Sequence, residues 1–269
     1  MLLEELFKTD KPIIGVVHLK PLPGSPRFEG SWWSVVEAAE RDAIALYEGG
    51  VDGIIIENYG DSPYYPDTVP PHTIACITYA ASCVARLVDL PIGISVLRND
   101  SISALSIAYA VGAKFIRVNV LYGAMITEQG IIAGKPHELI RLKSLLKSDI
   151  AVFADVMVKH AHPLSPFYDA QIAAKENVER CGADAVIVTG KATGEPPTLD
   201  YVESMKRAVG EYPLLVGSGI NEENVERFLR VSDGAIIGTY FKQQAVTTNP
   251  VDVERVSKLM ELVRRIRGG

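Results

Sequence analysis

The sequence predicts an α/β fold, a single closed (β/α)8 TIM barrel that spans residues 1–269. Eight short runs are rich in Val and Ile, a helix-like stretch follows each run, and the length of 269 residues suits one barrel. The runs lack polar alternation, which is typical of parallel strands buried on both faces. They are Pro12–His18, Gly53–Glu57, Pro91–Leu97, Lys114–Asn119, Ile150–Asp155, Asp184–Thr189, Pro213–Gly217 and Gly234–Gly238.

The stretches between the runs are amphipathic and predict the helices that cover the barrel. They lie near residues 34–49, 72–88, 101–111, 137–147, 167–181, 198–208, 222–230 and 251–266. A weak repeat supports the alternation, because Gly50–Ile56 and Gly182–Val188 share a Gly-x-Asp pattern before a β-branched run. In both copies we expect a helix to end at a left-handed Gly before the next strand begins. A doubly wound open sheet uses the same turn, but the count of eight favours the barrel.

Composition excludes several classes of protein. With 48% hydrophobic and 22% charged residues the chain is neither disordered nor fibrous. A net charge of −6 argues against a nucleic-acid partner. The three cysteines show no C-x-x-C spacing, so we interpret them as buried hydrophobes, with a reactive thiol as the alternative. No window predicts a transmembrane segment and the first residues do not resemble a signal peptide, so we expect a cytoplasmic protein.

Two glycine-rich loops predict a phosphate site. The seventh run leads into Gly217, Ser218 and Gly219, and the eighth leads into Gly238 and Thr239. In barrels the loops after strands seven and eight recurrently bind phosphate. Glycines let the backbone approach the ligand, and free N–H groups favour an anion. The alternative is that these glycines only make tight turns.

Polar residues follow most of the other runs, and the carboxyl ends of barrel strands converge on one axis. The candidate catalytic residues are His18, Glu57, Asn119, Asp155, Lys159 and His160. The candidate substrate-lining residues are Asn58, Arg98, Asn99, Thr189 and Lys191. Glu57 and Asp155 supply an acid–base pair, with His18, Asn119 and Lys159 orienting the substrate and His160 able to shuttle protons. The alternative is that some of these residues are helix caps or satisfied structural polar groups.

Cofactor chemistry finds less support. We expect no required cofactor, although His18, Glu57, Asp155, His160 and His162 could ligate a divalent metal. No H-x-x-x-H or H-E-x-x-H spacing supports that alternative. Lys191 suggests a Schiff-base lysine, but its place in a Gly-rich loop favours contact with phosphate. The same loop does not match a P-loop, so ATP hydrolysis of that kind is excluded.

Three loops could cover a substrate. The first follows the first run and leads to Trp32 and Trp33, the second follows the second run and holds Tyr59, Tyr64 and Tyr65, and the third is the apolar, Gly-rich segment Val120–Lys135. Such loops either close over substrate or pack against another subunit. We therefore expect a homo-oligomer.

Several segments resemble the BtpA/SgcQ family. The resemblance lies in Gly15–Pro26, Asp52–Asn58, Ala154–Ala161, Val216–Gly219 with Asn224, and Ile237–Lys242. It implies a barrel of the ribulose-phosphate-binding type. The family name comes from a role in photosystem I biogenesis or stability, and other members look like enzymes of sugar metabolism. The family brings no established catalytic residue to this chain.

The sequence thus predicts an enzyme that acts on a small phosphorylated, sugar-phosphate-like metabolite, with isomerase or lyase chemistry favoured over hydrolysis. The alternative is a non-catalytic biogenesis or stability factor for a membrane complex, associated peripherally with the membrane. That role requires an exposed apolar patch near Trp32 and Trp33 and has no need of convergent polar strand ends. A carbohydrate-binding or regulatory barrel is a third, more distant alternative.

Overall fold

The computed structural model describes residues 2–268, in which eight parallel strands close into a barrel in the order β1-β11-β10-β9-β7-β4-β3-β2. This confirms the predicted fold class, and each predicted run contains one barrel strand. The strands are β1 Ile13–His18, β2 Gly53–Glu57, β3 Ile92–Ser95, β4 Phe115–Val118, β7 Ala151–Asp155, β9 Ala185–Val188, β10 Leu214–Val216 and β11 Ala235–Ile237.

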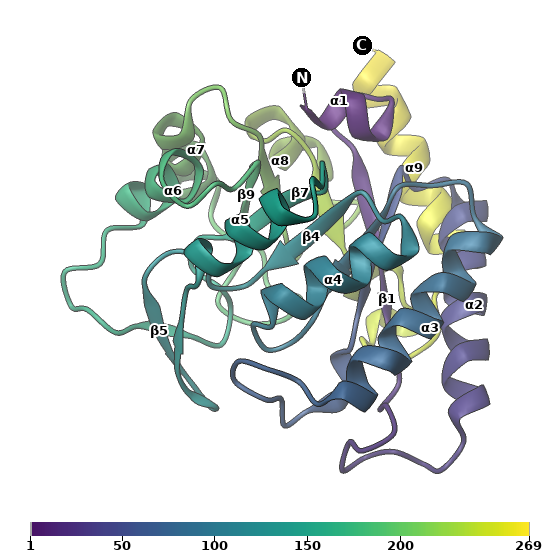
Figure 1. Ribbon diagram of the computed structural model, residues 1–269. Coiled ribbons are helices and arrows are strands. Elements are labelled where there is room, and N and C mark those ends of the chain that lie inside the picture. Colours follow the sequence, from purple (N-terminus) through teal and green to yellow (C-terminus); the bar gives the residue numbers. More distant parts are fainter. Residues whose placement is uncertain (1, 269) are drawn as a thin grey trace.

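Helices surround the barrel, as Figure 1 shows. They are α2 Trp32–Gly49, α3 Pro71–Leu87, α4 Ser101–Val111, α5 Pro136–Leu145, α6 Ala170–Glu179, α7 Leu199–Val209, α8 Val225–Val231 and α9 Val253–Gly268. The helix ends follow local chemistry: Ser31 caps α2 by accepting a hydrogen bond from the Ser34 N–H. Gly50 and Gly182, the glycines of the repeat, have φ angles of 87° and 77°. The left-handed turn predicted before each of those two strands is therefore present.

The short helix α1 (Leu2–Phe7) lies before the first predicted strand, in a segment for which we predicted no helix. It lies at the top of Figure 1, at the opposite end of the molecule from strand β5. Its Phe7 ring packs edge-on against Phe115, with ring centroids 5.6 Å apart. A six-residue helix has little stability of its own, so this packing inside the barrel stabilises it.

The segment after β4 is more regular than the loop we predicted. It folds into an antiparallel hairpin of β5 (Ala124–Thr127) and β6 (Gly130–Ala133). The two-residue strand β8 (His162–Pro163) pairs with the other edge of β5. Short 3-10 turns complete the chain, at Tyr59–Asp61 (η1), Thr239–Phe241 (η2) and Gln243–Ala245 (η3).

Strand pleating determines where the polar residues point. Side chains two residues apart on a strand point to the same face of the sheet. Near the N-terminal ends of the strands, the side chains that point into the barrel are apolar. One buried cluster joins Leu3, Phe7, Ile14, Val16, Ile55, Phe115, Ala151, Phe153, Ala185, Ile187, Leu215 and Ile236. Two residues further along four of these strands stand His18, Glu57, Arg117 and Asp155. The same alternation that packs the core therefore carries charged side chains to the C-terminal end of the barrel.

A candidate active site at the C-terminal end of the barrel

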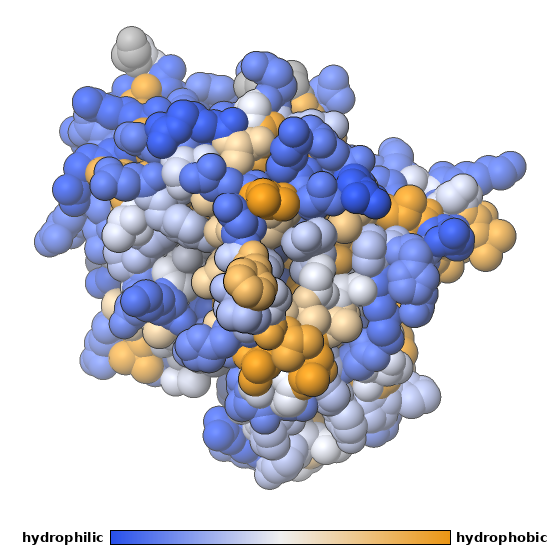
Figure 2. Space-filling view, turned by 90° about the vertical axis from the view of Figure 1, so that its left-hand side faces the viewer, coloured by the Kyte–Doolittle hydropathy of each residue, from blue (hydrophilic) through white to orange (hydrophobic). Residues whose placement is uncertain are grey.

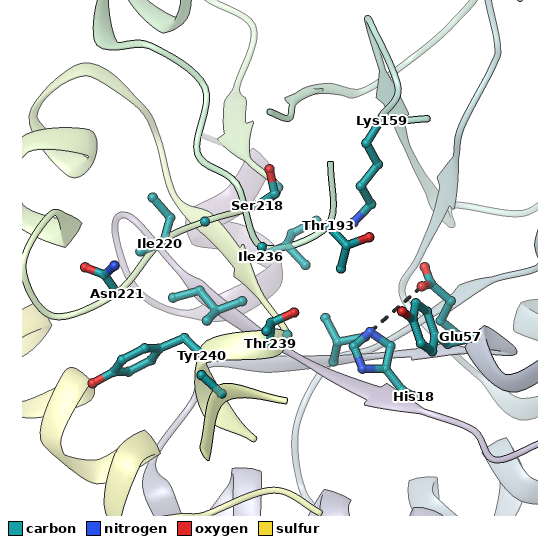
Figure 3. Close-up of a pocket in the computed structure, with 18 of the residues that line it drawn as sticks. His18, Glu57, Lys159, Thr193, Ser218, Ile220, Asn221, Ile236, Thr239 and Tyr240 are labelled. Atoms are coloured by element: carbon teal, nitrogen blue, oxygen red, sulfur yellow. Dashed lines mark ion pairs between the residues drawn. The ribbon is translucent and has the colours of Figure 1, made fainter. Parts of the chain in front are cut away.

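A cavity of about 140 Å³ opens at the C-terminal ends of the strands. All five predicted phosphate-binding residues line it, namely Gly217, Ser218, Gly219, Gly238 and Thr239. His18, Glu57, Lys159 and Arg117 line it as well. Figure 3 shows His18, Glu57 and Lys159 on one side of the cavity, with Ser218, Ile220 and Asn221 on the other.

The glycine wall presents backbone rather than side chains. Within residues 2–268, no hydrogen bond occupies the backbone N–H of Gly219, Ile220, Thr239 or Tyr240. Gly219 has a φ of +71°, and a Cβ there would collide with the backbone of Pro196. A Cβ on Gly238 would lie 2.9 Å from Cε1 of His18. Only glycine fits both positions without displacement, and the unoccupied N–H groups suit an anion.

The Ser218 side chain holds the loops together. Its Oγ accepts a hydrogen bond from the Gly190 N–H at 2.8 Å and donates one to the Glu195 carbonyl at 2.7 Å. Asn224 donates from Nδ2 to the Gly219 carbonyl at 2.9 Å. The loop after β10 is therefore fixed before any ligand arrives.

His18 and Glu57 form the base of the charged wall. They are register partners on β1 and β2, and His18 Nε2 lies 4.0 Å from Glu57 Oε1 (Figure 3). Burial, reinforced by the positive charges of Lys242, Lys159 and Arg117, lowers the pKa of His18 well below its usual value. The imidazole is therefore neutral at pH 7, and Glu57 faces a hydrogen-bonding group rather than a cation.

Lys159 enters from the segment after β7. Burial and, after it, the positive charges of Arg117 and Arg98 lower its pKa to about 8, against the opposing effect of Glu57 and Asp155. An amine with a pKa near neutrality can either donate or accept a proton during a reaction. Lys159 is therefore a candidate for acid–base chemistry in this cavity.

Asp155 is the predicted residue whose position differs most from expectation. Its side chain has 0% exposure and lines neither this cavity nor the adjoining one. Its Oδ2 and Oδ1 accept hydrogen bonds from Nε and Nη2 of Arg117, both at 2.9 Å. Asn119 donates to Oδ2 at 3.0 Å. Asp155 thus reaches the cavity only through these two partners, in place of the direct contact that we predicted.

Arg117 is a functional candidate that the sequence analysis missed. It lies inside β4, where the neighbours Phe115, Ile116 and Val118 are fully apolar. A single charge within a buried strand costs free energy unless it is paired. The presence of one arginine in this apolar run was therefore the signal that could have marked Arg117 as a candidate.

A second cavity of about 240 Å³ adjoins the first and shares Glu57, Tyr59, Arg117, Lys159 and Thr193 with it. Its other charged or titratable lining residues come from several segments of the chain. They are Arg27, Tyr64, Arg98, Glu128 and His160. Asn119 also lines it, so three further predicted site residues, Arg98, Asn119 and His160, meet here.

Four predicted lining residues contact neither cavity. Asn58 accepts from the Leu97 N–H at 2.7 Å, and Asn99 accepts from the Val120 N–H at 2.8 Å. Thr189 donates to the Met157 carbonyl at 3.2 Å, while Lys191 is exposed. The first three residues hold adjacent loops in place, which is the structural alternative considered for such residues.

In the described part of the chain, no group of three His, Cys, Asp or Glu side chains is arranged to hold a metal ion. The helices formed by residues 2–268 include none that is long and apolar enough to cross a membrane.

Fold and site together define a TIM-barrel protein with a polar pocket at the carboxyl ends of its strands. Solved structures support the fold. N-(5'-phosphoribosyl)anthranilate isomerase from Pyrococcus furiosus is 15% identical, with a TM-score of 0.58, over 96% of this chain and 100% of that one. Wild-type GGGPS from Thermoplasma volcanium is 15% identical, with a TM-score of 0.61, over 100% and 97%.

The chain belongs to the BtpA family, whose model matches residues 9–265. The photosystem I biogenesis protein BtpA of Synechocystis is 45% identical over 257 residues, which cover 96% of this chain and 89% of that protein. An uncharacterized protein of Thermococcus kodakarensis is 48% identical over 257 residues, covering 96% and 97%. These matches confirm the family resemblance drawn from the sequence.

Proposed function

We propose that this protein is an enzyme that acts on a small phosphorylated metabolite by acid–base chemistry of the isomerase or lyase type. One observation carries the proposal: a single cavity joins glycine loops with unoccupied N–H groups to a wall that contains Glu57, His18 and Lys159. The first wall suits a phosphate, and the second suits proton transfer.

The residues divide the work as follows. The unoccupied N–H groups of Gly219, Ile220, Thr239 and Tyr240 hold the phosphate, whereas the Gly217 N–H already donates to the Val188 carbonyl at 2.8 Å. Glu57 removes a proton from the carbon next to a carbonyl group, and the Lys159 ammonium donates a hydrogen bond to the carbonyl oxygen. Neutral His18 lies beside Glu57, with Nε2 4.0 Å from Oε1, and helps to orient the substrate. Asp155 is a positioning residue, because it acts through Arg117 and Asn119.

Two comparisons agree with this chemistry. The Pyrococcus furiosus structure with the same fold is, by its name, an isomerase of a phosphoribosyl compound. A further structure with a TM-score of 0.57 is described as native KDPGal. Both are less than 25% identical to this chain, so they support a barrel that can host such a site and leave the substrate open.

Deuterium exchange tests the proposal even while the product of the reaction is unidentified. The protein is incubated in D₂O with a panel of phosphorylated aldoses, ketoses and keto sugar acids, and proton NMR follows loss of the C–H signal next to the carbonyl. We expect exchange in at least one substrate, and we expect Glu57→Gln to abolish it. The matched control is Lys191→Gln, which changes an exposed residue outside both cavities and retains exchange. Absence of exchange across the panel, or undiminished exchange by Glu57→Gln, would overturn the proposal.

A second candidate is a role as an assembly factor, which the name of the Synechocystis relative favours. One structural feature is consistent with it: Trp33 is 61% exposed and its ring lies 6.1 Å from that of Tyr79, itself 44% exposed. Figure 2, which faces the side that carries β5 in Figure 1, shows separate apolar patches on a largely hydrophilic surface. Rescue of a Synechocystis strain that lacks BtpA separates the candidates. An assembly role predicts that Trp33→Ser fails to rescue and Glu57→Gln succeeds, and the enzyme predicts the reverse.

A further inference from the structure

The second cavity contains a cation that the chemistry proposed above does not use. Arg98 is 5% exposed and lines this cavity. Its Nη1 donates to Oδ1 of Asn119 at 3.1 Å, and its Nη2 donates to the Lys159 carbonyl at 2.6 Å. Its Nε is buried and has no hydrogen-bond partner among residues 2–268. An unpaired donor of this kind costs free energy unless a ligand or another group relieves it.

Among residues 2–268, Arg98 has no carboxylate within ion-pair distance, and the exposed Glu128 on the same cavity acts on it only at longer range. None of the ion pairs within the described residues includes Arg98, whereas Arg117 is paired with Asp155. The nearest neutral partners, Asn119 and the Lys159 carbonyl, hold the guanidinium in position but leave its charge in place. A buried arginine in this state is well suited to receive an anion.

The charges around the joined cavities leave a small positive excess. Three cations lie toward the interior, Arg98, Arg117 and Lys159, and they face two carboxylates, Glu57 and Asp155. At the rim, exposed Arg27 and exposed Glu128 carry one charge of each sign, and the positive charge of Arg98 contributes to the lowered pKa of Glu128. Burial and the nearby charges of Arg98 and Lys159 lower the pKa of His160, so it adds no charge at pH 7. One uncompensated positive charge therefore remains next to the site.

We propose that the second cavity is a subsite for a carboxylate of the substrate, held by Arg98 at the opposite end from the phosphate. The inference rests on the proposed function, since it assumes that the glycine loops hold a phosphate in the first cavity. The substrate class is thus a phosphorylated sugar acid rather than a neutral sugar phosphate.

The charge count favours a carboxylate over a second phosphate. A carboxylate brings one negative charge to the one guanidinium of this cavity that lacks a close carboxylate partner, whereas a second phosphate would bring about two next to Glu57 and Glu128. The shared residues Glu57, Arg117 and Lys159 then face the middle of the substrate, between its two anionic ends. Binding both ends fixes the reacting carbon against Glu57, which is the geometric requirement for rapid proton transfer.

Matched pairs of ligands test this subsite by isothermal titration calorimetry at pH 7. The pairs are 3-phosphoglycerate and glycerol 3-phosphate, 4-phosphoerythronate and erythritol 4-phosphate, and 6-phosphogluconate and glucitol 6-phosphate. Within each pair only the carboxylate differs in charge. We expect the acid to bind about tenfold more tightly than the alcohol at the chain length that spans both cavities. Arg98→Gln should remove most of this preference and leave the Kd of the alditol phosphate within about twofold of wild type.

Controls separate this inference from the proposed function. Thr239→Asp places a carboxylate beside the phosphate loops, so it should weaken both members of each pair. If neither member binds wild type, the proposed function fails. If both members bind equally and Arg98→Gln changes nothing, the subsite fails while the phosphate site stands. Tighter binding of a bisphosphate than of the matching acid would also overturn the carboxylate assignment.

Folding of the variants does not limit the test. Arg98→Lys keeps the charge and loses the planar fork, and we expect it to retain part of the preference. A crystal structure of the wild-type protein with 6-phosphogluconate gives an independent measurement. Density for the carboxylate next to Arg98 supports the subsite, and density for it elsewhere overturns the assignment.

Discussion

The two ends of the barrel interior are built from the same strands and do different work. At the N-terminal end, Phe115 stacks on Phe153 with ring centroids 4.8 Å apart, and Phe7 closes the layer. At the C-terminal end, the same alternation brings Arg117 and Asp155 to the interior. One end buries apolar area, which stabilises the fold, and the other buries charge, which costs free energy.

Glycines show the difference most clearly. At the N-terminal end, a Cβ on Gly93 would collide with the ring of Phe115 and a Cβ on Gly53 would contact Phe7, so both glycines make room for aromatic packing. At the C-terminal end, Gly219 and Gly238 bring bare backbone to a cavity. The same residue type therefore serves packing at one end and ligand access at the other. The role of a glycine therefore depends on whether it lies within a strand, as Gly53 and Gly93 do, or in the loop after a strand, as Gly219 does.

The largest effect is expected from Phe115→Ala. Phe115 is fully buried and contacts both Phe7 and Phe153, so its truncation should reduce the free energy of unfolding by about 5 kcal/mol. Urea denaturation measures the loss. The affinity for a phosphate ester should remain near that of wild type in the folded fraction. A loss below about 1 kcal/mol would show that this end is not the stabilising layer.

The next effect is expected from Asp155→Ala, which leaves Arg117 buried without its carboxylate. We expect the free energy of unfolding to fall by about 3 kcal/mol. This is the lower end of the range for breaking a buried ion pair, because Glu57 still attracts Arg117. The matched variant is the double replacement Arg117→Met with Asp155→Leu. It should recover most of the stability but none of the activity. Full stability of Asp155→Ala would contradict the positioning role of this residue.

A smaller and opposite effect is expected from Lys159→Met. The pKa of Lys159 is about 8 in the fold against an ordinary value of 10.5, so the unfolded chain binds more protons between these values. Wild-type stability should therefore rise as pH increases through this window, and the variant should lack that component of the rise. At pH 7 the free energy of unfolding of the variant should exceed that of wild type by about 1–2 kcal/mol. Partial solvation of the Lys159 ammonium makes this gain smaller than the shift in pKa alone would give.

Thermal or urea unfolding at pH 7 and pH 10 provides the measurement for Lys159→Met. The difference in free energy of unfolding between wild type and variant, compared at the two pH values, isolates the contribution of Lys159 from that of other groups that titrate between pH 7 and pH 10. Its charged neighbours Arg117, Glu57, Asp155 and Arg98 are the same in both proteins. A variant less stable than wild type at pH 7 would show that Lys159 contributes to packing rather than to function.

The sequence predicted the barrel well because buried parallel strands leave a strong local signature. Runs such as Ile150–Asp155 can be recognised without reference to their neighbours in space. The position of the two glycine loops was predictable for a similar reason, since Gly219 and Gly238 follow the seventh and eighth strands and line the cavity there.

Other features depend on contacts that a sequence does not display. Helix α1 is stabilised by Phe115, more than 100 residues away in the chain, so propensity alone did not reveal it. Asp155 occupies the predicted layer, but its partner Arg117 lies 38 residues away and shields it from the cavity. Asn58 and Asn99 stand just past the strands, where the pleat no longer directs side chains inward, and each bonds to a neighbouring loop.

Binding of glycerol 3-phosphate to three proteins tests the central claim most directly: wild type, Thr239→Asn and Thr239→Asp. The two variants lose the same hydroxyl contact with Thr247 and differ only in charge next to the phosphate loops. Isothermal titration should show wild type and Thr239→Asn within about threefold of each other, with Thr239→Asp weaker by at least tenfold. Equal binding by all three proteins would contradict a phosphate site at this end of the barrel.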